Sequence, residues 1–167
     1  MTAPATLPRS DESVMRLALE QARLALAADE VPVGAIIVAP DGAVVAAAHD
    51  ERMARCDPTA HAEILAMRQA AAALGDWRLE NCDLFVTLEP CPMCAGAVVM
   101  ARLRRVIYGA ASVKSGAVET HLRLLDIATF NHRVEALGGV LAAECGAVLT
   151  EYFRGRRRPA PVNENPA

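Results

Sequence analysis

The pattern of apolar and polar positions along the chain predicts alternating helices and strands. Ser10 precedes two acidic residues, as is typical of a helix start, and the apolar positions that follow recur at helical spacing. We therefore predict an amphipathic helix over residues 11–28. The apolar runs 33–38 and 43–47 flank the turn sequence Pro40-Asp41-Gly42, which predicts a β-hairpin.

The middle of the chain continues the alternation. Residues 49–57 are polar and irregular and predict a loop, which leads into a helix over residues 59–74. Gly75 suits the end of that helix because glycine readily adopts the left-handed conformation found there. Residues 84–88 predict a buried strand, and Pro92 then suits the first position of a further helix, where its missing N–H costs nothing.

The last third predicts two more strands and a final helix. We expect strands over residues 105–108 and 132–137 and a helix over 141–156, with a surface loop over 110–131 that contains one helical turn around 122–125. Strands that alternate with helices after an opening hairpin indicate an α/β sandwich with a mixed sheet.

Composition and length favour one domain with its own core. The chain has 167 residues, of which 53% are hydrophobic and 22% charged, and this composition excludes a disordered chain. We assign residues 1–158 to this domain and 159–167 to a polar, proline-rich and disordered tail. With no signal peptide, no run as long as a membrane span and an odd number of cysteines, five, we expect a cytoplasmic protein without membrane contact.

Two short motifs carry the chemistry. His61 and Glu63 form an H-x-E motif, and Cys91 and Cys94 form a P-C-x-x-C motif with the preceding proline. A C-x-x-C pair alone also occurs in thioredoxin-like redox sites, and a lone H-x-E is an ordinary helix start. Together they form the known signature of zinc-dependent nucleobase deaminases. One imidazole and two thiolates leave the fourth position of a tetrahedral Zn²⁺ open for water, which is typical of a catalytic site.

The predicted helix starts favour this chemistry. A helix N-terminus carries partial positive charge, which stabilises the thiolates of Cys91 and Cys94. His61 and Glu63 can address one point only if both lie in the first turn, because a spacing of two turns side chains to opposite faces of a continuous helix. Glu63 is then the expected proton carrier between water, the ring nitrogen and the departing amine. Cys56, Cys82 and Cys145 are interpreted as small core or surface residues.

With these motifs in place, the chain resembles the bacterial tRNA-specific adenosine deaminases, which convert the wobble adenosine of an anticodon to inosine. The resemblance runs from about Val14 to Arg158 and depends on five segments of sequence. These are Val31-Pro32-Val33-Gly34-Ala35, Asp57-Pro58-Thr59-Ala60-His61-Ala62-Glu63, Val86-Thr87-Leu88-Glu89-Pro90-Cys91-Pro92-Met93-Cys94-Ala95-Gly96-Ala97, Asn131-His132-Arg133-Val134-Glu135 and Phe153-Arg154-Gly155-Arg156-Arg157.

The resemblance implies a three-layer α/β/α sandwich of the cytidine-deaminase-like type with a five-stranded mixed sheet, one Zn²⁺ per subunit and a homodimer. It also implies the anticodon stem-loop of tRNA as substrate. The substrate-binding residues that it implies are Val33, Asp50, Ala62, Leu88, Ser112, Asn131, His132, Phe153, Arg154, Arg156 and Arg157. The arginine-rich end suits phosphate contact, although such a run is also found at solvated helix ends. Phe153 could stack on a base or belong to the core.

Two positions depart from the family pattern. The family usually has asparagine where this chain has Asp50, and often aspartate where it has Ser112. An ionised carboxylate accepts hydrogen bonds but donates none, so Asp50 suits the N–H groups of guanine better than the acceptor-rich edge of adenine. A free-base deaminase acting on guanine or cytosine is therefore an alternative hypothesis. A catalytically silent zinc protein that binds RNA is a further one, which the presence of Glu63 disfavours.

Overall fold

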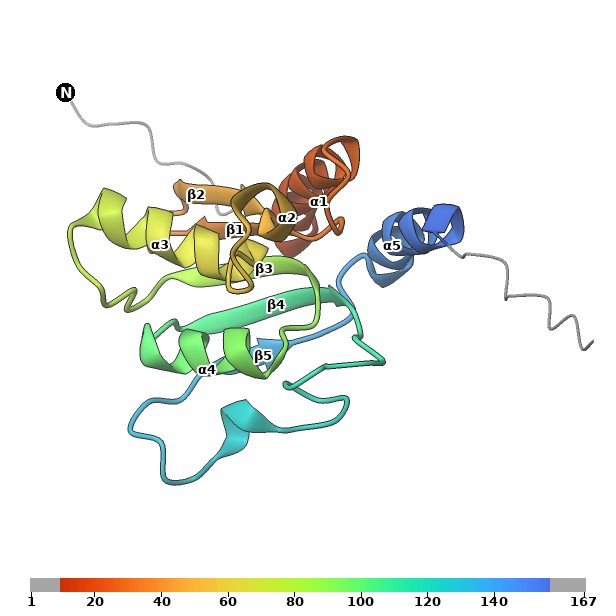
Figure 1. Cartoon of the computed structure of the whole chain (residues 1–167). Helices are drawn as coiled ribbons and strands as arrows, with labels where there is room; N and C mark the ends of the chain where they lie inside the picture. Colours follow the sequence, from red (N-terminus) through yellow and green to blue (C-terminus); the bar gives the residue numbers. More distant parts are fainter. Residues whose placement is uncertain (1–9, 157–167) are drawn as a thin grey trace, which may run out of the picture.

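The computed structural model describes residues 10–156. Along the chain these form α1 (Asp11–Ala27), β1 (Gly34–Val38), β2 (Val44–His49), α2 (Arg52–Arg55), α3 (Ala62–Leu74), β3 (Asp83–Leu88), α4 (Pro92–Met100), β4 (Arg105–Ala110), the 3₁₀ turn η1 (Leu124–Asp126), β5 (Glu135–Leu137) and α5 (Ala142–Arg156) (Figure 1). No helix in this range is both long and apolar enough to span a bilayer. The predicted tail over 159–167 and Arg157 lie outside the described residues.

The five strands form one mixed sheet in the order β2-β1-β3-β4-β5. β1 runs antiparallel to both of its neighbours, β2 and β3, whereas β3, β4 and β5 run parallel to one another. A tight turn joins the antiparallel strands β1 and β2, whereas the parallel strands need longer crossovers: α4 joins β3 to β4, and a long loop that contains η1 joins β4 to β5. The predicted mixed sheet of five strands is confirmed.

Helices cover both faces of this sheet (Figure 1). Alternate strand residues point to opposite faces, so Ile36, Phe85 and Ile107 pack in one cluster with α1 and a residue of α5. Their neighbours along the strands, which include Ala35 and Val86, pack in the other cluster with α3 and α4. The sheet is therefore buried between two helical layers, as the expected three-layer sandwich requires.

Gly34 lets α1 approach the sheet closely. A Cβ atom at this position would lie 2.0 Å from the carbonyl oxygen of Ala18 and 2.5 Å from the backbone nitrogen of Ala22, both in α1. Only glycine fits, because these neighbours are backbone atoms that cannot turn aside. The Gly34 N–H donates to the buried hydroxyl of Thr87 in β3, which fixes the start of β1 beside the end of β3.

Several loops begin or end together at one end of the sheet. Gly34 at the start of β1 pairs with His49 at the end of β2, and Leu88 at the end of β3 pairs with Ala110 at the end of β4. We call this the site end. The segments that follow β2 and β3 lead directly into α3 and α4, which both run back from the site end toward the opposite end (Figure 1).

The structure differs from the sequence prediction in the loop after β2. The predicted loop 49–57 contains the short helix α2, and α3 begins at Ala62 instead of residue 59. The side chain of Asp57 accepts hydrogen bonds from the backbone N–H and the hydroxyl of Thr59, which holds residues 57–60 in a turn and delays the helix. The predicted strand 132–137 is shortened to Glu135–Leu137.

Candidate active site

Three metal-ligand side chains meet at the site end. His61 is the N-cap of α3, Cys91 is the N-cap of α4, and Cys94 lies on the third residue of α4. The Nδ1 atom of His61 lies 3.7 Å from Sγ of Cys91 and 3.5 Å from Sγ of Cys94. The three ligand atoms lie within 4.8 Å of one another. Two helix starts from distant parts of the chain thus bring one imidazole and two thiols to a common centre.

The spacing of these atoms fits tetrahedral zinc. With Zn–S bonds of about 2.3 Å and a Zn–N bond of about 2.0 Å, sulfur and nitrogen lie about 3.6 Å apart around one ion. The observed 3.5 and 3.7 Å agree with this value. No fourth His, Cys, Asp or Glu among residues 10–156 joins the cluster. The residues present therefore fit a metal site with three protein ligands.

Charge at the ligands is consistent with cation binding. A hydrogen bond from Cys94 lowers the pKa of Cys91 to about 4, so this thiol is ionised at neutral pH. The same hydrogen bond, together with burial and the nearby Glu63 charge, raises the pKa of Cys94 far above its ordinary value. A bound cation would favour the thiolate form of both cysteines. The first turns of α3 and α4 also direct their partial positive charge at this point.

Glu63 lies beside the ligands on the second residue of α3. Its side chain is buried, with 4% of its surface exposed, and burial raises its pKa to about 7. The pKa of His61 is raised mainly by a hydrogen bond that its imidazole donates to Cys91; burial acts to lower this pKa, and the nearby charge of Glu63 raises it further. His61 and Glu63 therefore reach one site despite a spacing of two, because His61 precedes the helix and Glu63 lies in its first turn. A carboxyl group with this pKa can both accept and release a proton near neutral pH.

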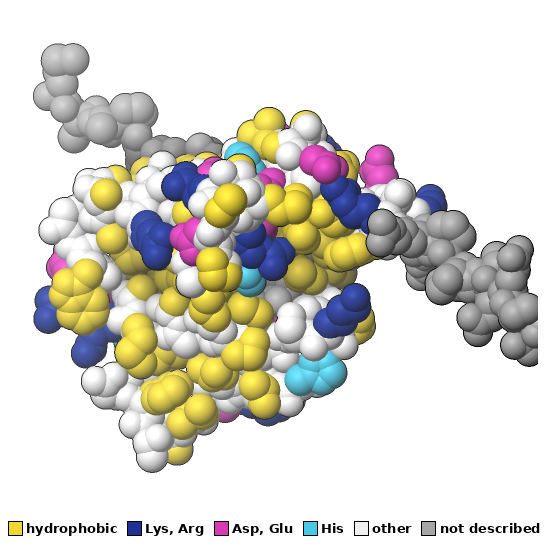
Figure 2. Space-filling model, viewed as in Figure 1, with side chains coloured by type: hydrophobic (Ala, Val, Ile, Leu, Met, Phe, Trp, Pro, Cys, Tyr) yellow, Lys and Arg dark blue, Asp and Glu magenta, His cyan; other side chains and the backbone are white. Residues whose placement is uncertain are grey.

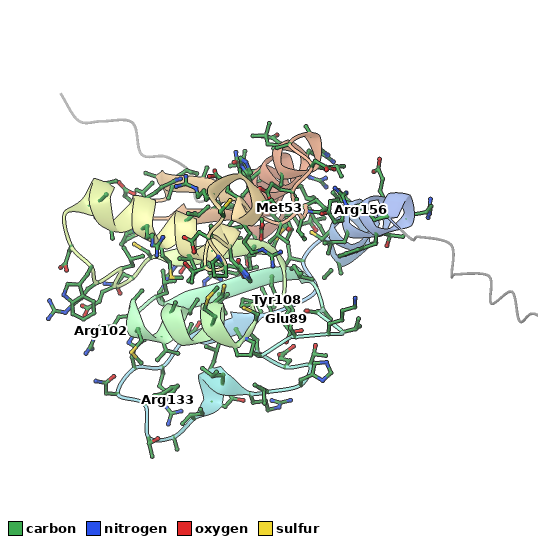
Figure 3. The ribbon with its side chains drawn as sticks, viewed as in Figure 1. Met53, Glu89, Arg102, Tyr108, Arg133 and Arg156 are labelled. Atoms are coloured by element: carbon green, nitrogen blue, oxygen red, sulfur yellow. The ribbon has the colours of Figure 1, made fainter. Side chains whose placement is uncertain are left out.

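A second buried carboxylate, Glu89, lies two residues before Cys91 and binds the loop after β4. It accepts backbone N–H bonds from Ser112, Val118, Glu119 and Thr120 at 2.8–3.1 Å, and a further bond from the Thr120 hydroxyl. Burial acts to raise its pKa, but these five donors outweigh it and lower the pKa to about 2. Glu89 lies at the end of β3 near Tyr108 of β4 (Figure 3). The loop after β4 is thereby fixed next to the cysteines.

Comparisons with known proteins agree with this site. The family model of the MafB19-like deaminases matches residues 9–157. The tRNA-specific adenosine deaminase of Bacillus subtilis (strain 168) is 46% identical over 148 residues, which make up 89% of this chain and 91% of that protein. The chain belongs to the tRNA-specific adenosine deaminase family. The enzyme of this name from Haemophilus influenzae is 41% identical over 92% of this chain and 89% of its own length.

Solved structures of two kinds share the fold of this deaminase. One, from a study of A-to-I editing by tRNA:A34 deaminases at the wobble position, is 46% identical with a TM-score of 0.78, and covers 81% of this chain and 97% of its own. The other, a guanine deaminase from Nitrosomonas europaea, is 26% identical with a TM-score of 0.77, and covers 92% and 94%. The fold is therefore common to a tRNA deaminase and a guanine deaminase, and the TM-scores do not distinguish them. This chain is more similar in sequence to the first than to the second.

Five of the substrate-binding residues implied by sequence gather at the site end of the deaminase. Val33 accepts the backbone N–H of Asp50, and Ala62 is the first residue of α3. Leu88 ends β3, and Ser112 follows β4 and donates to Glu89. Val33, Asp50, Ala62 and Ser112 are buried and Leu88 is half-buried. Their contact with substrate stays a prediction.

The last turn of α5 also lies near the site end. Arg156, at the end of α5 (Figure 3), forms an ion pair with Asp29 in the loop before β1. Its guanidinium stacks on Tyr152 at 3.9 Å. Phe153 is 48% exposed, and the ammonium group of Lys114 lies 5.6 Å from its ring centre. Arg154 is exposed. Phe153 is thus a surface aromatic beside cations, and not a core residue, whereas Tyr152 is buried.

Asn131 and His132 lie elsewhere. His132 is hydrogen bonded through Nε2 to the carbonyl oxygen of Leu103, which precedes β4, and so it lies at the end of the strand opposite to the ligands. Asn131 lines a groove between α3 and α4 together with Arg102. Figure 3 shows Arg102 far from Glu89. The structure does not bring these two residues to the metal ligands of the same subunit, and their role in substrate binding stays a prediction.

Three residues that shape this site were not predicted from the sequence. Glu89 could have been noticed as a carboxylate that directly ends the apolar strand 84–88. Glu30 is also buried, and it accepts the N–H groups of Met53 and Ala54 at the start of α2. Arg52 on α2 holds the carboxylate of Asp50. Glu89 and Glu30 bind residues that are distant in sequence, and Arg52 lies on α2, a helix that the sequence did not predict.

Proposed function

We propose that this chain hydrolyses the wobble adenosine of tRNA to inosine and releases ammonia. The observation that carries the proposal is the convergence of His61, Cys91 and Cys94 with the buried carboxyl of Glu63. Membership of the tRNA-specific adenosine deaminases supports the choice of substrate, because their identity of 41–46% extends over most of the chain. The deaminase from the study of tRNA:A34 editing has the same fold at 46% identity.

The metal that suits this donor set is zinc. Zn²⁺ held by His61, Cys91 and Cys94 would supply an acidified water at its open fourth position. Glu63, with a pKa of about 7, takes a proton from the attacking water and delivers it to the purine ring nitrogen. Glu63 then takes the proton of the new hydroxyl on the purine carbon and passes it to the amine, which leaves as ammonia while the carbonyl of inosine forms. Because Glu63 is buried and close to the ligands, bulk water does not compete for this proton.

The surroundings of the site suit a nucleotide in a single-stranded loop. A base must leave its stack to reach a buried carboxylate, as anticodon loops allow. Phe153 offers an exposed ring for stacking, with the ammonium group of Lys114 5.6 Å from its ring centre. Arg154 and Arg156 lie on the same end of α5, on a chain whose net charge is −3. Local cations of this kind attract phosphates without an overall basic protein.

We propose that a second copy of this chain covers the groove between α3 and α4. The groove has a volume of about 530 Å³ and is lined mainly by apolar side chains, among them Met67, Trp77 and Met100. Trp77 is 57% exposed and Met100 60% exposed, and Figure 2 shows hydrophobic side chains across this face. Large apolar patches of this kind are typical of subunit interfaces. A cytoplasmic homodimer, each subunit one domain over residues 1–158, is the assembly that we propose.

Guanine deamination is the second candidate. Asp50 favours it, because an ionised carboxylate accepts hydrogen bonds from guanine but cannot donate to adenine. The Nitrosomonas europaea guanine deaminase shares the fold at 26% identity. The lower identity makes this the weaker candidate.

One assay separates the two candidates. The purified protein, loaded with zinc, is incubated with an anticodon stem-loop that carries adenosine at the wobble position, and separately with guanine and with cytosine. Inosine and ammonia are then quantified. We expect inosine from the RNA and no ammonia from either base. A matched stem-loop with its only loop adenosine outside the wobble position should not react. Ammonia from guanine together with unreacted RNA would contradict the proposal.

A further inference from the structure

Asp50 and Arg52 form an ion pair between a buried carboxylate and a partly exposed guanidinium, and neither group takes part in the proposed proton transfer. The side chain of Asp50 is 4% exposed, and the Nε group of Arg52 donates to both of its oxygens at 3.0 and 3.1 Å. The backbone N–H of Arg52 donates to the same carboxylate at 3.2 Å. A buried carboxylate is costly unless it is paired, so Asp50 depends on Arg52 for its charge balance.

This pair is next to the metal ligands. The backbone N–H of Asp50 donates to Val33 at the start of β1, and the N–H of Glu51 donates to Ala60, the residue before His61. Arg52 is therefore close enough to the site to contact a nucleotide bound there.

Two buried carboxylates fix Arg52 in place. Asp50 holds its side chain, and Glu30 accepts the N–H groups of the next two residues, Met53 and Ala54, at 3.1 and 2.6 Å. Within residues 10–156, the two terminal Nη groups of Arg52 make no hydrogen bond. Its side chain is 36% exposed, so these donors are open to a ligand. A guanidinium presents them in a fixed, planar geometry.

We propose that Arg52 is a specificity residue whose Nη groups donate hydrogen bonds to acceptor atoms of the substrate nucleotide. This inference rests on the proposed function and names a contact within it. Asp50 cannot itself donate to an acceptor-rich adenosine, and Arg52, which it holds, supplies the missing donors. Asp50 and Arg52 therefore work as one unit, in which the first positions the second.

A double-mutant cycle tests this unit. The zinc-loaded wild type is compared with Arg52→Ala, Asp50→Asn and the double variant on the wobble-adenosine stem-loop, and kcat/KM is measured for each. Arg52→Ala should lower kcat/KM by about 10- to 100-fold, the worth of a hydrogen bond to a charged group. Asp50→Asn replaces the charge that holds Arg52 by an amide, which also adds a hydrogen-bond donor. In this background, Arg52→Ala should lower kcat/KM by less than about 3-fold. Losses that multiply in the double variant would overturn the proposal.

Controls separate substrate contact from folding. Arg55→Ala removes an exposed arginine of the same helix, paired with Glu51, and should leave kcat/KM within about 2-fold of the wild type. All variants should retain zinc and be fully folded at the assay temperature, although Arg52→Ala, which leaves the Asp50 carboxylate unpaired, should have a lower melting temperature than the wild type. If Arg52→Ala lowered kcat/KM only in proportion to lost zinc or lost folded protein, its role would be structural and the proposal wrong.

The salt dependence of RNA binding then identifies the acceptor. The slope is that of the logarithm of the binding constant against the logarithm of the salt concentration. If Arg52→Ala leaves this slope unchanged, the contact is to the base or ribose; if it reduces the slope by about 0.7, the contact is to a phosphate. If the wild type made no inosine, the proposed function would fail. The cycle would then be run with the same criteria on whichever purine the wild type deaminates.

Discussion

Replacing Glu89 by glutamine removes one charge and adds N–H groups where the structure provides only donors. Four backbone N–H groups and one hydroxyl converge on the two oxygens of this carboxylate. A glutamine side chain has one oxygen, and its NH₂ group would face donors that it cannot accept. A Cβ atom on Gly116 would lie 2.2 Å from the carboxylate, so the cradle has little room to rearrange. The variant should therefore fold less stably.

The size of the loss follows from the pKa of Glu89. Its fall from 4.5 to about 2 on folding corresponds to about 3 kcal/mol at 1.36 kcal/mol for each pH unit. Because the pKa is lower in the folded state, this stabilisation is present above pH 4.5. It disappears as the pH falls toward 2 and the carboxylate becomes protonated.

Urea unfolding measures this effect. The difference in unfolding free energy between the wild type and Glu89→Gln should be about 3 kcal/mol at pH 7 and should shrink steadily below pH 4.5. Both proteins have the same metal ligands, so metal loss in acid cancels in the difference. Glu144→Gln, at an exposed ion pair with Arg16, is the matched control and should change stability by less than about 0.5 kcal/mol. A difference below 1 kcal/mol at pH 7, or one that does not change with pH, would refute the reasoning.

Four further predictions concern catalysis, packing, assembly and RNA binding. Glu63→Gln should keep its zinc but lose at least about a thousandfold in kcat, since the proton carrier is gone; inosine formation at the wild-type rate would contradict its role. Gly34→Ala should destabilise the fold by about 3 kcal/mol in urea unfolding, whereas Gly146→Ala, at an open position on α5, should stabilise it by about 1 kcal/mol. Trp77→Asp should convert the dimer to monomer in sedimentation equilibrium, and a monomeric wild type would exclude the proposed interface. Arg154→Ala should reduce the salt slope of stem-loop binding by about 0.7, and an unchanged slope would make this arginine only a solvated helix end.

The sequence predicted most of the fold because local patterns determine most of its elements. Apolar periodicity located every strand to within a few residues, and the capping residue Ser10 marked the start of α1, where it accepts the N–H of Ser13. The exact start of α3 could not be predicted from periodicity. It depends on the turn that Asp57 forms with Thr59, which competes with the helix for the same backbone groups.

The metal ligands were predictable for a similar reason. His61 and the two cysteines lie in short motifs, and each motif begins a helix, so local sequence alone indicates both the ligands and the charge that favours them. The roles of Glu89 and Arg52 were not predictable. Glu89 joins β3 to a loop more than twenty residues later, and Arg52 depends on a helix whose stability comes from Glu30, again more than twenty residues away. Tertiary contacts of this kind leave no periodic pattern in the sequence.

The central claim is a zinc ion with three protein ligands and one solvent molecule beside Glu63. X-ray absorption at the zinc K-edge of the purified wild type tests it most directly. We expect one zinc per subunit, bound to two sulfurs at about 2.3 Å, one imidazole nitrogen and one further light atom at about 2.0 Å. That last atom should be replaced when a transition-state analogue binds. A third sulfur, a second imidazole or the absence of zinc would contradict it.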